Sequence, residues 1–178
     1  MHSLDGRLFR VTLGLFNMTR ELTQEEQATN FVTWQHIYEV QKRVAKVAAL
    51  LQERMLTHDQ SKLTDPEVEL FTVMTPKLKT AEYGSDAYKQ FLVDLKPALD
   101  NHYACNSHHP EHYPNGLDGM NLLDVLEMLC DWMASVSRSP NGSIDKSFEI
   151  NEKRFGMSPQ LVQIMKNTVP LLTGKPNE

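Results

Sequence analysis

Apolar residues recur every three or four positions over most of the chain after Thr23, which is the spacing of one face of a helix. The first such segment opens on TQEE, where Glu26 stands three residues after Thr23 and predicts a capping box. The apolar positions that follow it are Phe31, Trp34, Ile37, Val40, Val44, Val47, Ala48 and Leu51. We therefore predict a long first helix that starts at Thr23.

The middle of the chain predicts shorter helices. Asp65 and Pro66 can open a helix, which we expect Pro76 to interrupt. Residues 86–105 have helical periodicity again, and Pro97 within them either starts a new helix or kinks the old one. Two Pro and two Gly within ten residues then predict a loop over 110–119, PEHYPNGLDG.

The clearest amphipathic helix follows at 121–136, NLLDVLEMLCDWMASV. Its expected apolar stripe is Leu122, Val125, Leu126, Leu129 and Met133. A last helix is expected after Ser158, a good N-cap residue that Pro159 follows at the first helical position. Together these elements predict an all-α fold of about six helices.

The domain organisation follows from where this periodicity begins. We expect residues 1–22 to form an N-terminal extension and residues 23–178 to form one helical domain. Within the extension, the β-branched and aromatic residues of 7–16, RLFRVTLGLF, favour a short strand, an extended arm or a segment packed on the domain equally.

Composition narrows the class of protein. The chain has 178 residues, 40% of them apolar and 23% charged, which is a globular balance. The net charge of −5, with dispersed Lys and Arg, gives no electrostatic reason to expect duplex nucleic acid as a partner. A small anionic substrate remains compatible with this charge, because bound divalent cations reverse the local field.

The compartment is expected to be the cytoplasm. Cys105 and Cys130 belong to no CxxC pair and cannot build a disulfide framework, so we expect two small buried thiols in a reducing environment. No apolar run approaches the roughly 18 residues that a membrane span needs. The first twenty residues lack both a basic leader and a small-residue cleavage site, so they do not resemble a secretory signal.

Imidazole and carboxylate side chains gather in one part of the sequence. Four of the seven histidines stand within 101–112, NHYACNSHHPEH, and His36, the pair His58-Asp59 and the acids of 121–136 accompany them. Such a set suits first-row divalent metals, and also Mg²⁺ where oxygen ligands dominate. A histidine-rich surface loop and a few satisfied core histidines are the simpler interpretations, and the sequence leaves them open.

Local geometry limits which of these residues can cooperate. Pro110 disfavours helical geometry at His109, so we expect His102 on a helix and His108 and His109 at its end or in the following loop. Asp124 and Asp131 share a helix face but lie about 10 Å apart along its axis, which is too far for one metal. One of the two would bind a metal, and the other would orient a histidine or touch substrate.

The position of His36 requires a reversal of the chain. In one continuous helix His36 and His58 would lie about 33 Å apart. They can share a metal only if the chain turns back near Leu51–Met55, where no Gly or Pro marks a turn.

These residues carry a resemblance to known families. HDQSK at 58–62 resembles the His-Asp signature of the HD-domain metal phosphohydrolases. Residues 108–135 are similar to the His-His…Gly-Tyr-Pro…Asp stretch of the HD-GYP branch, although His112-Tyr113-Pro114 stands where that branch has Gly-Tyr-Pro. The combination of HD-x-SK, HHPEH and EM-x-DW also resembles a small uncharacterised family from phages and bacteria, over roughly residues 33–168.

The resemblance implies an HD-like all-α domain with one or two metal ions that hydrolyses phosphate esters. Matched by position, the core ligands would be His36, His58, Asp59 and Asp131, and the additional ligands of dinuclear branches would be His102, His108 and His109. Lys62 matches the lysine that approaches a substrate phosphate, and it shares the catalytic role with Asp59. Asp124, Glu127 and Asn106 are then expected to touch substrate or to orient the ligands.

The function expected from this resemblance is a metal-dependent phosphohydrolase of the nucleotidase or phosphodiesterase type. It would act through metal-activated water on a nucleotide or a related small phosphate ester, with Mn, Fe, Co, Ni, Zn or Mg as its cofactor. A cyclic nucleotide or dinucleotide phosphodiesterase and a non-catalytic metal-containing binding module are the alternatives. Phe31, Trp34 and the N-terminal residues can serve either internal packing or an interface in a homo-oligomer.

Overall fold

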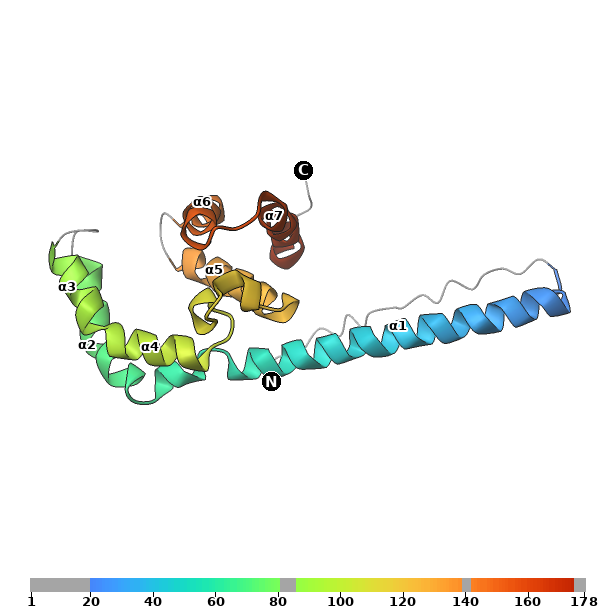
Figure 1. Ribbon diagram of the computed structural model, residues 1–178, viewed down its shortest axis with the longest axis horizontal. Coiled ribbons are helices and arrows are strands. Elements are labelled where there is room, and N and C mark those ends of the chain that lie inside the picture. The colour runs from blue at the N-terminus through green and yellow to red at the C-terminus, as the bar shows by residue number, and fades with distance from the viewer. Residues whose placement is uncertain (1–19, 81–85, 139–141, 175–178) are drawn as a thin grey trace, which may run out of the picture. The chain divides into compact units, whose positions relative to one another are not determined.

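The computed structural model describes residues 20–80, 86–138 and 142–174, and all of their regular structure is helical (Figure 1). The expected strand or arm at 7–16 lies outside the described residues. The α-helices are α1 (Gln24–Thr57), α2 (Glu67–Thr80), α3 (Asp86–Asp94), α4 (Lys96–Cys105), α5 (Leu122–Ser137), α6 (Ile144–Phe155) and α7 (Pro159–Thr173). Three 3₁₀ turns join them: η1 (Gln60–Leu63), η2 (Pro110–His112) and η3 (Gly116–Gly119). The all-α prediction is confirmed for the described residues. Residues 86–105 divide at Leu95, where Pro97 lies in the first turn of α4, and α6 forms over residues for which the sequence predicted no helix.

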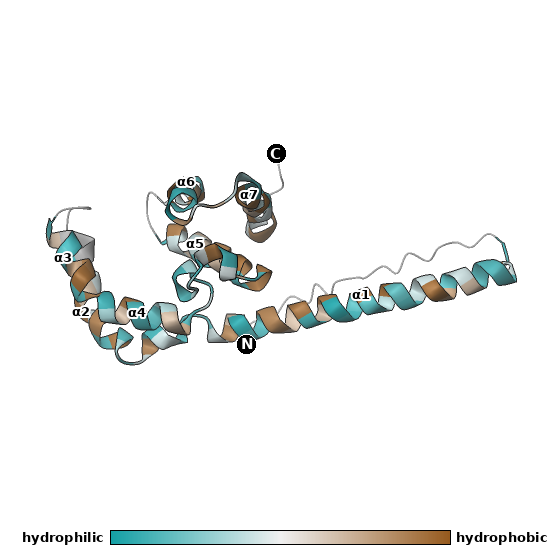
Figure 2. Cartoon of the chain, viewed as in Figure 1, coloured by the Kyte–Doolittle hydropathy of each residue, from teal (hydrophilic) through white to brown (hydrophobic). Residues whose placement is uncertain are grey.

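The chain divides into two compact units, Met1–Ala48 and Ala49–Glu178. In the described part of the first unit, the predicted capping box is present. The backbone N–H of Thr23 donates to Glu26 Oε2 at 2.9 Å, and the N–H of Glu26 donates to Thr23 Oγ1 at 3.2 Å. The apolar positions of α1 form brown bands along the helix in Figure 2, and none of its side chains, all of which are described, is buried.

One hydrophobic core of the second unit joins α5, α6 and α7. Met128 and Leu129 of α5 pack with Phe148 of α6 and with Val162 and Met165 of α7, and all of these side chains are buried. Trp132 and Met133 cover its margin. Because α5 is packed into this core, the direction of its acidic side chains is fixed as well.

A second hydrophobic core joins α2, α3 and α4. Met74 of α2 packs with Leu95 and Ala98 at the start of α4, and Phe91 of α3 lies against them. Contrary to the sequence prediction, α2 continues past Pro76 to Thr80. The φ angle of proline is compatible with a helix, so the helix can continue although one backbone donor is lost.

The segment between α4 and α5 is the predicted loop, and its two 3₁₀ turns make it compact. It ends at Asn121, whose side chain accepts hydrogen bonds from the backbone of Leu123 and Asp124, while Asp124 Oδ2 accepts from the N–H of Asn121 at 2.9 Å. This reciprocal cap fixes the direction in which the loop enters α5.

The apolar stripe predicted for α5 is partly wrong. Leu129 is buried, but Leu122, in the first turn of the helix, is 82% exposed, and Met128 takes part in the core instead. The packed face begins at Val125, one turn further along the helix.

No helix in the described part of the chain is both long enough and apolar enough to span a bilayer.

The two leucines of α5 provide a matched test of this packing. Leu129→Ala is expected to lower the free energy of unfolding by about 2–5 kcal/mol, because it leaves a cavity in the core. Leu122→Ala is expected to change it by less than about 0.5 kcal/mol, because that side chain is exposed. Denaturant unfolding followed by circular dichroism measures both values. Equal losses in the two variants would contradict the observed face of α5.

Candidate metal centre

The pair His58-Asp59 occupies the sharp turn that ends α1. Asp59 has φ 56° and ψ 16°, in the left-handed region that Asp and Asn tolerate better than most residues. The turn leads directly into η1, where Lys62 Nζ bonds Asp59 Oδ2 at 2.6 Å. Backbone and side chain therefore both depend on the residue type at position 59.

Three imidazoles face the carboxylate of Asp59. Nε2 of His102, on α4, and Nε2 of His108, in the following loop, each lie 3.5 Å from Asp59 Oδ1. Nε2 of His58 lies 3.5 Å from Asp59 Oδ2. Their placement, His102 on a helix and His108 beyond its end, confirms the expectation from Pro110.

Two glutamates hold the opposite nitrogens of these rings. Glu67 Oε2, fully buried at the start of α2, lies 2.9 Å from Nδ1 of His102. Glu127 Oε1 on α5 lies 2.7 Å from Nδ1 of His58 and 3.2 Å from Nδ1 of His108. Because a carboxylate only accepts hydrogen bonds, Nδ1 carries the proton in the neutral form of each ring, and Nε2 keeps a lone pair. Nε2 of His102 also lies 2.8 Å from Nε2 of His109, which brings a fourth imidazole to the group.

Two polar atoms at the middle of this arrangement have no hydrogen-bond partner among the described residues. They are Asp59 Oδ1 and His108 Nε2, and both are buried. Two acceptors that face each other without a proton between them are unfavourable in a buried site. A cation placed between them would satisfy both, so the donor set fits a divalent metal.

Among the described residues, three overlapping groups of side chains could hold such an ion, with the ligand atoms of each group within 4.8 Å of one another. They are Asp59, His102, His108 and His109; His58, His108 and Glu127; and His58, Asp59 and Asp131. Asp59, His58 and His108 each belong to two of the groups, so the groups form one continuous cluster.

The protonation states of the candidate ligands favour metal binding at neutral pH. Burial, helped by the neighbouring His108 and His102, lowers the pKa of His109 to about 3. Burial also lowers the pKa of His108. At Asp59 burial acts in the opposite direction, but the hydrogen bond and charge of Lys62 outweigh it and lower the pKa of the carboxyl group. Neutral imidazole and ionised carboxylate are the forms that coordinate metals.

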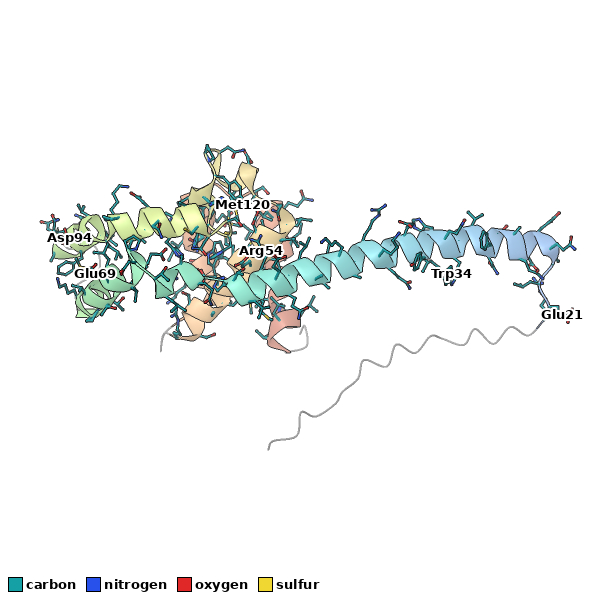
Figure 3. The ribbon with its side chains drawn as sticks, turned by 90° about the horizontal axis from the view of Figure 1, so that it is seen from below. Glu21, Trp34, Arg54, Glu69, Asp94 and Met120 are labelled. Carbon is teal, nitrogen blue, oxygen red and sulfur yellow. The ribbon has the colours of Figure 1, made fainter. Side chains whose placement is uncertain are left out.

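An arginine connects the centre to α5. Arg54, labelled near the end of α1 in Figure 3, bonds Glu127 Oε2 through Nε at 2.6 Å and Asp124 Oδ1 through Nη2 at 2.5 Å. Asp124 is buried, and it also accepts from Ser107 Oγ at 2.7 Å and Tyr113 Oη at 2.8 Å. Asp124 belongs to none of the three metal groups among the described residues. It therefore anchors Arg54, which in turn holds Glu127.

Most of the residues predicted for the site do come together. Besides Asp59, the metal groups contain the predicted ligands His58, His102, His108, His109 and Asp131. Lys62 contacts Asp59, and Asn106 Nδ2 donates to Ser61 Oγ and to the backbone carbonyl of His102, each at 2.8 Å. Asn106 thus joins η1 to the end of α4.

His36 requires a correction. Helix α1 is unbroken from Gln24 to Thr57, so the reversal near Leu51–Met55 on which the inclusion of His36 depended is absent. His36 is exposed and belongs to none of the metal groups found among the described residues. We therefore leave it out of the candidate centre. A second correction concerns the cysteines, because Cys105 and Cys130 are exposed rather than buried.

Sequence reasoning missed Glu67 and Arg54. Glu67 stands in the first turn of α2, where an acid is common because it compensates the helix dipole, so nothing in the sequence singled it out. Arg54 stands four residues before His58 on the same helix face, and this spacing was the available signal.

Among the described residues, three cavities adjoin the centre: a small one of about 140 Å³ is lined by His58, His108 and Glu127, and Asp131 lines the two larger ones. One, of about 400 Å³, has largely apolar walls that include Leu51, Met55 and Leu126. The other, of about 290 Å³, lies beside His109 and has aromatic and polar walls. A molecule bound at the metal centre can therefore extend into either.

The lowered pKa of His109 predicts how stability depends on pH. Since the unfolded chain binds a proton near pH 6.5 and the folded chain only near pH 3, stability is expected to fall as the pH decreases from about 6.5 toward 4. His109 alone contributes a slope of at most about 1.4 kcal/mol per pH unit. Denaturant unfolding of chelator-treated protein should show a shallower slope for His109→Gln. The exposed His36→Gln serves as the control, and an equal change in both variants would contradict the prediction.

Comparison with known proteins adds a family assignment. No curated protein and no solved structure matches the chain. A family model described as a family of unknown function (DUF5662) matches residues 25–171. That range is most of the chain, and the protein therefore belongs to this family of unknown function.

Proposed function

We propose that the protein is a metal-dependent phosphohydrolase that acts on a nucleotide or a related small phosphate ester. The observation that carries this proposal is the convergence on Asp59 of three imidazoles whose Nδ1 atoms are held by Glu67 and Glu127. Carboxylates that orient histidines in this way are typical of catalytic and structural metal sites. The two unpartnered buried atoms, Asp59 Oδ1 and His108 Nε2, support the same proposal.

The residues that would hold a first ion are Asp59, His102, His108 and His109, and those that would hold a second are His58, Asp59 and Asp131. A divalent metal bound there supplies activation of water at neutral pH and neutralisation of charge at phosphorus.

The chain's own residues prepare the site for an anionic substrate. Lys62 Nζ places a positive charge 2.6 Å from Asp59, and its side chain is 39% exposed, so it can also reach a phosphate oxygen of a bound ester. Glu67 and Glu127 keep the imidazoles in one tautomer. The burial of His102 and His108 limits the access of bulk water.

The location that fits this proposal is the cytoplasm. Both cysteines are unpaired thiols with exposed side chains, which suits a reducing compartment.

Metal binding is the first test. His108→Ala is expected to lower the affinity for Mn²⁺ or Zn²⁺ by more than about a hundredfold, because loss of even an orienting partner costs 10–100-fold. Calorimetric titration of chelator-treated protein measures this change, and elemental analysis identifies the metal in the purified protein. His36→Ala is the matched control and should bind metal as the original chain does. Equal affinity in all three proteins would refute the centre.

Hydrolysis is the second test. Metal-loaded protein is expected to hydrolyse one of a deoxynucleoside monophosphate, a deoxynucleoside triphosphate and a cyclic dinucleotide, with chromatography of the products showing loss of phosphate groups from the first two or opening of the ring of the third. Lys62→Ala should reduce kcat by about a hundredfold or more, because it removes a charge that stabilises the transition state. Lys96→Ala, an exposed lysine paired with Asp100, should leave kcat unchanged. Tight metal binding without turnover of any phosphate ester would favour the binding module instead.

A further inference from the structure

We propose that the polar cavity beside His109 and Asp131 binds the flat heterocyclic base of a single nucleotide, with Trp132 and Asn151 as recognition residues. This inference rests on the proposed function for the position of the phosphate, and it adds which part of the substrate is recognised and where.

The position of the cavity links it to the metal centre. The cavity of about 290 Å³ is lined by His109, by Asp131 and Trp132 of α5, and by Asn151 and Arg154 of α6. His109 and Asp131 are also members of two different metal groups. An ester whose phosphorus lies at the metals would therefore carry its organic substituent into this cavity.

The walls suit an aromatic ring. Trp132 and Phe155 have nearly parallel rings, with 10° between their planes and centroids 6.5 Å apart, and Tyr103 lines another part of the cavity. Aromatic side chains stack on nucleobases of any sequence, by about 1–3 kcal/mol per base. Trp132 is held from behind by an edge contact with the buried Phe148, so its orientation is fixed.

Neutral hydrogen-bonding groups complete the site. Asn151 lies on α6, and its Nδ2 donates to Ser147 Oγ at 3.2 Å, with Ser135 also in the lining. An amide offers donors and an acceptor in one plane, which matches the edge of a base.

The charge of the cavity argues against a further phosphate. Arg154 is the cation in its lining, and its Nη2 bonds Glu111 Oε1, also in the lining, at 2.5 Å. The guanidinium also lies 4.8 Å from the ring centroid of Phe155. Because Glu111 compensates this charge, the cavity favours a neutral ring over a second anionic group.

The volume of this cavity, and its difference from the apolar cavity beside Leu51, further narrow the kind of ligand that it can bind. Pockets for drug-sized ligands run from about 300 to 1,000 Å³, so this one is near the size of a single ring system with its sugar. Two joined nucleosides would exceed it. The 400 Å³ cavity beside Leu51 and Met55 is walled mainly by apolar groups, which would leave the polar edge of a base unpaired.

The two tryptophans of the chain allow a direct test. Trp34→Phe removes the exposed indole of α1 and leaves Trp132 as the fluorescent reporter. In this background, deoxyadenosine and deoxycytidine, which carry no phosphate, are titrated into metal-loaded protein, with deoxyribose as the non-aromatic control. We expect saturable quenching by at least one nucleoside and none by deoxyribose. Asn151→Ala should weaken the nucleoside Kd by about tenfold, the loss expected for one or two hydrogen bonds.

Two controls separate this site from its alternatives. Asn167→Ala alters an exposed asparagine of α7, and Ala134→Leu fills the apolar cavity, and both should leave the nucleoside Kd unchanged. Absence of saturable quenching would overturn the inference. So would a loss of nucleoside affinity in Ala134→Leu with no loss in Asn151→Ala.

Because nucleosides are not substrates for phosphate release, this result is independent of hydrolysis. Turnover of phenyl phosphate without nucleoside binding would contradict the base site alone, whereas nucleoside binding without turnover of any ester would support it and contradict the phosphohydrolase.

Discussion

The carboxylate of Glu127 is the interaction on which the arrangement of the centre depends. One of its oxygens faces Nδ1 of both His58 and His108, and the other accepts from Nε of Arg54. A single side chain of α5 thus fixes the end of α1 and the loop after α4. Without it, two imidazoles would lose the acceptor that holds their tautomer, and among the described residues Arg54 would be held by Asp124 and Ser107 alone.

The residues of the candidate centre also come from helices that belong to two different hydrophobic cores of the second unit. Glu67 and His102 come from α2 and α4, which share the core around Leu95 and Ala98. Glu127 and Asp131 come from α5, whose Met128 and Leu129 belong to the other core. Polar side chains therefore connect two apolar clusters, and a bound ion would add a direct link between them.

Much of this fold and part of the centre could be predicted from the sequence, for identifiable reasons. The capping box at Thr23, the helical position of His102 and the effect of Pro110 on His109 are local consequences of residue type. Glu67 could not be found in this way, since its contact with His102 joins residues 35 positions apart through the packing of α2 on α4. The inclusion of His36 failed for a different reason. The absence of Gly or Pro near Leu51–Met55 already indicated an unbroken helix, whereas His36 entered the predicted site only through its place in the ligand order of families that the sequence resembles.

The left-handed backbone at Asp59 means that two separate requirements act on this position, one from the turn and one from the carboxylate, and a comparison of sequences alone would not distinguish them. The turn itself accepts Gly or Asn as readily as Asp, whereas a β-branched residue would strain it whether or not a metal is bound. Homologues that keep Asp, Asn or Gly at this position would therefore be preserving the end of α1, and only those that keep the carboxylate would be preserving the chemistry. Variation between Asp and Asn at position 59 would thus separate relatives that keep the carboxylate of the candidate centre from relatives that keep only the turn.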